Sequence, residues 1–196
     1  MSKCPICKGL NVLERPDGRG WMQCSHVAEI LAVQRLDRAH IPAAYKDISF
    51  QSRSSVIQDF MLEGGSAMIF SKDAARKGTA LTVMMIRKAV TAGMEARYIS
   101  CHDLFVDARN SFRDEEGEAY FWRAYSSVAL LVIDDLFSVR HSEYELDTLY
   151  RLIYGRGTKQ KDILLVFAPG LNLKNLSARN PALFLKIKPF LKEVNI

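Results

Sequence analysis

Two consecutive aspartates end an apolar run in this chain. Residues 129–136 read Ala-Leu-Leu-Val-Ile-Asp-Asp-Leu, a pattern typical of a buried parallel strand that stops at acidic residues. Such a strand delivers Asp134 and Asp135 to its carboxyl end, where open α/β sheets bind ligands. One carboxylate can help to hold the Mg²⁺ of a nucleotide and the other can polarise an attacking water, so we predict both as catalytic residues of a Walker B element. The alternative is a buried strand followed by two acids that cap the next helix.

The segment before this strand has the order strand, loop, helix. Residues 66–70 predict a strand, and residues 79–92 predict a helix with apolar residues on one face. The loop between them, residues 71–79, lies where a phosphate-binding loop would read G-x-x-x-x-G-K-[ST]. Ser71 and Arg76 replace the two glycines, and Gly78 stands where Ser or Thr is expected.

These replacements weaken the expected phosphate cradle. Glycine permits the positive φ and the close backbone approach that phosphates need, whereas Ala75 and Arg76 bring side chains into that space. Positive charge near a helix N-terminus still favours an anion, either ATP with Mg²⁺ or a DNA phosphate. We therefore predict weak ATP binding, with the cofactor-binding residues Arg76, Lys77, Gly78 and Thr79.

A buried Walker B carboxylate without Mg-nucleotide needs another partner, because an unpaired buried charge is costly. In a P-loop arrangement the loop after the first strand lies beside the acid-bearing strand. We therefore predict a contact between Lys77 and Asp134, direct or through one water.

Cysteine and histidine spacing at the N-terminus indicates a metal site. A C-x-x-C knuckle gives two thiolates to one ion, and a Cys-x-His pair beyond a turn-rich segment completes a tetrahedron. Because a segment of about 26 residues cannot bury a hydrophobic core of its own, it needs a metal ion or another cross-link to hold it folded. We predict one structural Zn²⁺ bound by Cys4, Cys7, Cys24 and His26. The alternative is an unstructured tail with a redox-active C-x-x-C.

The remaining cysteine and histidines carry no spacing signal. Cys101 follows an apolar stretch and is expected to be a small buried residue. His40, His102 and His141 have no partner visible in the sequence and are expected on the surface or in turns.

Length and charge fit one α/β domain with a small appendage. The chain has 196 residues, and 27 basic against 22 acidic residues give a net charge of +5. This balance is a modest indication of contact with the DNA backbone, and ordinary solubility explains it equally well. Since no apolar run is long enough to span a membrane and no signal peptide is visible, we expect a cytoplasmic protein without membrane contact.

Taken in this order, the segments resemble the DnaC/IstB-type helicase loaders and transposition ATPases of the AAA+ superfamily. The resemblance spans nearly the whole chain. It includes an entry segment at 41–50, a second strand and helix at 97–104, a DD-L-G motif at 134–137 with Phe137 in place of glycine, and a sensor 1 strand at 163–167. That strand ends in Ala168-Pro169, where the family usually has Thr/Ser-Asn. Lys186 stands where the family carries an arginine, and Arg179 is another candidate.

The resemblance implies a three-layer α/β AAA+ P-loop NTPase-like core with a parallel sheet. We place this core at residues 46–196, after a zinc-binding module at 1–27 and a helical linker at 28–45. It also implies a helicase-loader-like accessory protein of DNA replication, whose partner is a replicative helicase or another replication or transposition protein. Contact with the DNA backbone and a homo-oligomer are further expectations.

Several residues that contact the nucleotide in the family are replaced in this sequence: the loop glycines, the polar sensor pair and the arginine near the C-terminus. We therefore expect an adaptor that is a weak or inactive ATPase. The alternative is an active Mg-ATPase of helicase loading or of IstB-like DNA transposition.

Overall fold

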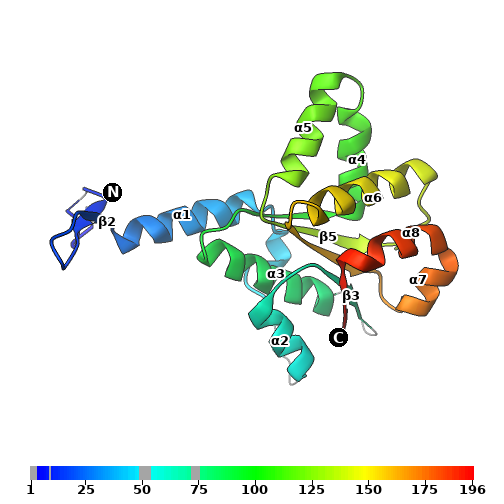
Figure 1. Ribbon diagram of the computed structural model, residues 1–196, viewed down its shortest axis with the longest axis horizontal. Coiled ribbons are helices and arrows are strands. Elements are labelled where there is room, and N and C mark those ends of the chain that lie inside the picture. Colours follow the sequence, from blue (N-terminus) through cyan, green and yellow to red (C-terminus); the bar gives the residue numbers. More distant parts are fainter. Residues whose placement is uncertain (1–3, 9, 49–53, 72–75) are drawn as a thin grey trace.

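A five-stranded parallel sheet forms the centre of the protein. The computed structural model describes residues 4–8, 10–48, 54–71 and 76–196 (Figure 1). The strands of the sheet lie in the order β4-β5-β6-β3-β7, and every neighbouring pair is parallel. They are β3 (Ala67–Phe70), β4 (Ala96–Ser100), β5 (Leu130–Leu136), β6 (Asp162–Phe167) and β7 (Lys192–Asn195).

Helices cover both faces of this sheet, because parallel strands need crossover connections. One face carries α1 (Ser25–Arg38), the short 3-10 helix η1 (Ala43–Tyr45), α2 (Ser55–Glu63) and α3 (Arg76–Thr91). The other carries α4 (Cys101–Ser111), α5 (Glu115–Ser126), α6 (Glu143–Gly157), α7 (Leu173–Arg179), α8 (Pro181–Ile187) and the 3-10 helix η2 (Lys188–Phe190).

Alternation along β5 divides the core between the two faces. Val132 belongs to the same buried cluster as Leu81 and Ile86 of α3. Ile133 belongs to the second cluster, with Leu152 of α6. Successive residues of a strand point to opposite faces, so both sides of this apolar strand are buried. The predicted three-layer α/β architecture is confirmed.

Most element boundaries lie close to those predicted, with two differences. Helix α3 begins at Arg76, three residues earlier than predicted, so Lys77 and Gly78 are helical. The run of charged residues at 113–118 by itself predicts a solvated surface loop, but in the structure residues 115–118 form the first turn of α5. The Asp114 side chain accepts a hydrogen bond from the Gly117 N–H and so caps that helix, and acidic residues in a first turn favour helix formation.

The N-terminal segment forms a small hairpin at the end of α1 that lies away from the sheet (Figure 1). Strands β1 (Val12–Glu14) and β2 (Trp21–Gln23) pair antiparallel around a turn in which Gly18 and Gly20 have positive φ. Helix α1 begins at Ser25, inside the predicted module, so the module and the predicted linker share one helix. Within the described ranges, no helix combines the length and apolarity needed to cross a bilayer.

Candidate functional site

Asp134 lies at the carboxyl end of β5, on the sheet face that α3 covers. Its side chain is only 6% exposed, and three groups of the chain donate hydrogen bonds to it. Oδ2 accepts from Thr79 Oγ1 at 2.7 Å and from Tyr98 Oη at 2.5 Å, and Oδ1 accepts from the Asp135 N–H at 2.7 Å. Burial raises the pKa of the Asp134 carboxyl, and these three hydrogen bonds oppose that rise.

The threonine beside this carboxylate is one residue later than the motif predicts. Helix α3 packs so close to β6 that a Cβ at Gly78 would lie 2.6 Å from Val166 Cγ1. A side chain at position 78 is therefore excluded unless Val166 moves. Thr79 is buried and places its hydroxyl against Asp134. A threonine hydroxyl beside a Walker B carboxylate fits the protein ligands that Mg²⁺ takes in P-loop proteins.

Asp135 and Lys77 are two further predicted nucleotide residues, and both are exposed. Asp135 is exposed with a positive φ of 59°, and its backbone carbonyl accepts a hydrogen bond from Ser138. Lys77 is exposed on the first turn of α3. The three described hydrogen bonds to Asp134 all come from neutral groups, so the predicted Lys77–Asp134 contact finds no support among them. Residues 72–75 of the loop and 49–50 of the entry segment lie outside the described residues.

Aromatic rings stack at the carboxyl ends of β3, β5 and β6, on the sheet face opposite Asp134. Phe167 ends β6 and stacks on Phe70, the last residue of β3, at 4.6 Å between ring centroids. Phe137, just after β5, also stacks on Phe167, with 6.0 Å between the ring centroids. Lys186 lies 4.6 Å from the centre of the Tyr150 ring in α6. These side chains have apolar or cation–π partners within the fold.

The four predicted metal ligands meet at the base of the N-terminal hairpin. Their ligand atoms all lie within 4.8 Å of one another. The Sγ atoms of Cys4 and Cys24 are 3.9 Å apart, and Cys7 Sγ lies 3.5 Å from His26 Nδ1. Zinc–sulfur bonds of about 2.3 Å in a tetrahedron put two sulfurs about 3.8 Å apart. The cluster can therefore hold a zinc ion with little rearrangement.

Local structure explains how these ligands converge. The knuckle is closed by a 2.8 Å hydrogen bond from the Lys8 N–H to the Cys4 carbonyl. Cys24 is joined to the other side of the hairpin by a 3.0 Å bond to the Asn11 carbonyl, and it is also the N-cap residue of α1. His26 is in the first turn of that helix, so a bound ion would join the knuckle to α1.

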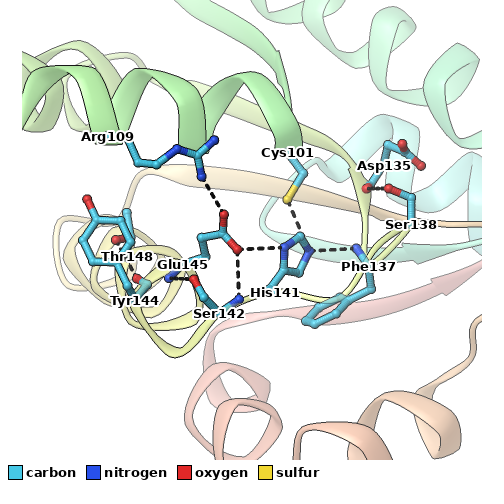
Figure 2. Close-up of polar contacts among 10 residues, drawn as sticks. All are labelled: Cys101, Arg109, Asp135, Phe137, Ser138, His141, Ser142, Tyr144, Glu145 and Thr148. Carbon is cyan, nitrogen blue, oxygen red and sulfur yellow. Dashed lines mark hydrogen bonds and ion pairs between the residues drawn. The ribbon is translucent and has the colours of Figure 1, made fainter.

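His141 forms a polar cluster that sequence reasoning missed (Figure 2). Its side chain is 4% exposed, and its Nε2 accepts a hydrogen bond from the Phe137 N–H at 3.3 Å and lies 3.7 Å from Cys101 Sγ. Nδ1 lies 3.6 Å from Glu145 Oε2, and the other oxygen of Glu145 accepts from Arg109 Nη1 at 2.9 Å. Nothing in the spacing of these residues could have revealed the cluster.

Cys101, His141 and Glu145 are arranged in the sequence nucleophile, base, carboxylate of a catalytic triad, but the burial of Cys101 argues against catalysis. Cys101 is 2% exposed, and burial raises the pKa of its thiol to about 12. A buried thiol that stays protonated is a poor nucleophile. The expectation of a buried Cys101 is confirmed. His141 lies in the loop before α6, as expected, but it has partners from α4 and α6 that the sequence does not show.

The fold of this chain is similar to that of several solved structures of replication proteins. The crystal structure of the DnaC helicase loader superposes with a TM-score of 0.66 at 16% identity, covering 79% of this chain and 99% of that chain. DnaI gives 0.63 at 12% identity, covering 80% and 95%. The replication initiator DnaA bound to AMPPCP and single-stranded DNA gives 0.64 at 15% identity, covering 80% and 51%. The core has the AAA+ fold.

These structural matches confirm the AAA+ fold of the DnaC/IstB type that the order of the segments predicts. Comparison with protein-family models and with curated protein sequences found no match. At these identities the likeness concerns the fold, and the activity of this domain must be argued from its own residues.

Proposed function

We propose that this chain is a helicase-loader-like AAA+ accessory protein of DNA replication that acts as an adaptor on a replicative helicase. The observation that carries this proposal is the extent of the fold match. It covers 99% of a DnaC helicase loader and 95% of DnaI, but only 51% of the DnaA initiator. A chain that reproduces nearly the whole of two loader structures is better suited to their type of task than to that of a larger initiator.

The weak or absent ATPase activity in this proposal is supported by the end of β6. A polar sensor there would orient the γ-phosphate or its attacking water, and here Ala168 and Pro169 follow Phe167, the last residue of the strand. Preorganised polar groups supply most of the stabilisation in phosphoryl transfer, so the loss of a polar sensor removes part of it.

An active Mg-ATPase is the second candidate, and one contact favours it. Thr79 and Asp134 already make the hydroxyl–carboxylate pair that Mg²⁺ uses, with Thr79 one position beyond the usual place. Asp135 beside them is exposed and can reach a water. Steady ATP turnover that disappears in Asp135→Asn would decide for this candidate.

In the same proposal the N-terminal cluster holds a structural Zn²⁺. The ligand set Cys4, Cys7, Cys24 and His26 is complete in itself, so it leaves no open position for substrate. The role is to fix the hairpin at the end of α1, where it is presented away from the ATPase-like core. Contact with the DNA backbone and self-association remain part of the proposal and rest on charge and fold.

The test is binding of purified full-length protein to the replicative helicase of its own host. An adaptor should form a stable complex with or without ATP, measured by size-exclusion chromatography with light scattering. Asp135→Asn should leave that complex unchanged, because the proposal gives hydrolysis no part in docking. Absence of a complex under all nucleotide conditions would contradict the helicase-adaptor function.

A further inference from the structure

Tyr98 brings a hydroxyl group to the Walker B carboxylate from a neighbouring strand. In the sheet register Tyr98 of β4 lies opposite Val132 of β5, and Asp134 is two residues further along. Residues two apart on a strand share a face, so Tyr98 and Asp134 both lie beneath α3. Tyr98 is 9% exposed, and its Oη lies 2.5 Å from Asp134 Oδ2.

The lone pairs of the carboxylate are largely used by the protein itself. An ionised carboxylate offers about four acceptor sites. Thr79 and Tyr98 both bond to Oδ2, and the backbone N–H of Asp135 bonds to Oδ1. A Mg²⁺ ion can use the hydroxyl of Thr79 and the carboxylate together, since both are oxygen ligands. The tyrosine hydroxyl donates its hydrogen to Oδ2, the same oxygen that Thr79 contacts, so a metal held by Thr79 and Oδ2 together would compete with this hydrogen bond.

We propose that the Tyr98 hydroxyl occupies the side of the Asp134 carboxylate that a Mg²⁺ ion would contact, and so lowers the affinity of this site for metal. Metal binding must break a buried hydrogen bond to a carboxylate, and at 6% exposure of Asp134 little water is at hand to replace it. The inference rests on the proposed nucleotide site. It explains how neutral hydrogen-bond donors accommodate the buried carboxylate of Asp134, as is needed in an adaptor that works without bound Mg-nucleotide.

The experiment is a titration of full-length protein with Mn²⁺, a paramagnetic substitute for Mg²⁺, followed by electron paramagnetic resonance with and without AMPPCP. Tyr98→Phe removes only the hydroxyl and should bind Mn²⁺ about tenfold tighter or more than the wild type, since a hydrogen bond to a charged group no longer has to break. Equal Mn²⁺ affinity of wild type and Tyr98→Phe, including no binding by either, would overturn the proposal.

Tyr125 supplies a matched control. It is a buried tyrosine whose hydroxyl donates to another aspartate, Asp107, on the opposite face of the sheet. Tyr125→Phe should bind Mn²⁺ like the wild type, because it loses the same type of bond away from Asp134. Tighter Mn²⁺ binding by both variants would reveal a general loosening of the fold and would also overturn the assignment to Tyr98.

A second measurement applies if Tyr98→Phe does not fold. Fluorotyrosine placed at position 98 of the otherwise unchanged chain should change its ¹⁹F chemical shift on addition of Mg²⁺ with AMPPCP, whereas fluorotyrosine at 125 should not. An unmoved signal at saturating metal overturns the proposal. Helicase binding is measured separately and does not depend on Tyr98, so loss of that binding counts only against the adaptor function.

Discussion

His141 couples the loop after β5 to two helices through one imidazole ring. The Phe137 N–H donates to Nε2, so this nitrogen is the acceptor of a neutral ring whose Nδ1–H faces Glu145 (Figure 2). Phe137 has a positive φ of 63° at the position where the resembled family has glycine. A non-glycine residue in that conformation is strained by about 1 kcal/mol, and the hydrogen bond to His141 helps to hold it.

This arrangement predicts acid sensitivity. Burial lowers the pKa of His141 in the folded protein, while Glu145 opposes that shift. As the pH falls, His141 therefore takes up a proton in the unfolded state before it does so in the folded state. The free energy of unfolding then falls below the ordinary histidine pKa of about 6.5, by at most about 1.4 kcal/mol per pH unit. The polar groups next to the ring are the Cys101 thiol from α4, the Glu145 carboxylate from α6 and the Phe137 N–H. Arg109 of α4 contacts the other oxygen of Glu145.

His141→Gln isolates this contribution, because glutamine can accept from Phe137 and donate to Glu145 without titrating. Urea unfolding at pH 7.5 and pH 5.5 should show a smaller loss of unfolding free energy in His141→Gln than in the wild type. Burial alone would raise the pKa of Glu145, but its hydrogen bonds lower it, so its own loss of stability begins at more acidic pH. Equal losses in both proteins would show that His141 does not titrate on unfolding.

Arg156 is a second buried side chain with a purely structural role. Its guanidinium donates to the carbonyls of Tyr125, Ala129 and Asp162, which joins α6 to the end of α5 and the starts of β5 and β6. Burial lowers its pKa to about 10, so it remains charged at neutral pH.

Arg156→Ala should lower the free energy of unfolding by about 3 kcal/mol or more, because it leaves buried carbonyls without a donor and opens a cavity. Arg156→Lys should cost less, since one ammonium can still reach some of these carbonyls. Urea denaturation of the three proteins measures the order. A loss below about 1 kcal/mol in the alanine variant would show that water replaces the guanidinium.

At this scale the sequence predicts residues that belong to contiguous motifs and misses those that depend on register. Asp134 and Thr79 were expected in one site and are in contact. Tyr98 was not expected there, because its place follows from the pairing of β4 with β5. His141 was missed for the same reason: its partners come from α4 and α6.

Helix α3 is placed by close contact with the sheet at its first turn. A Cβ at Gly78 would approach Val166 Cγ1 of β6 to 2.6 Å and Ile69 Cγ2 of β3 to 3.8 Å. The glycine that departs from the phosphate-loop motif therefore has a packing function. Gly78→Thr would restore the residue type that a phosphate-binding loop has at this position, but it drives a side chain into β6.

Gly78→Thr should accordingly lower the free energy of unfolding by about 1–3 kcal/mol, the usual cost of overpacking a core. Val166→Ala removes the methyl group that the new side chain meets. The double variant should therefore be more stable than the sum of the two single changes predicts, as measured by thermal and urea unfolding in a double-mutant cycle. Strict additivity would indicate that the strain lies elsewhere.

Element order was the most predictable level of this structure. Strands β3, β5 and β6 follow from apolar runs, and α3 from the spacing of apolar residues between a loop and Gly93. The start of α5 was misread because a run of acidic residues suits a solvated loop and a helix N-terminus equally well. Only the hydrogen bond from Gly117 to Asp114 distinguishes the two.

On the scale of the whole molecule, the N-terminal hairpin and the AAA+ core are stabilised in different ways. The core has two continuous apolar clusters, one on each face of the sheet. The hairpin instead exposes most of its large apolar side chains: Ile6, Leu10, Trp21 and Met22. With so little apolar burial, we expect its order to come from metal binding by Cys4, Cys7, Cys24 and His26.

Metal removal should therefore unfold the hairpin and the first turn of α1 while the core stays folded. Metal analysis should find one zinc per chain in the wild type and in Cys101→Ala, whose thiol lies in the core. Cys24→Ser should lose the metal, whereas His26→Cys should retain it, because four thiolates also suit zinc. After chelation, hydrogen exchange should quicken in residues 10–26 and remain slow in β5. A metal-free protein with a protected hairpin would show that the Cys/His cluster is not what holds it.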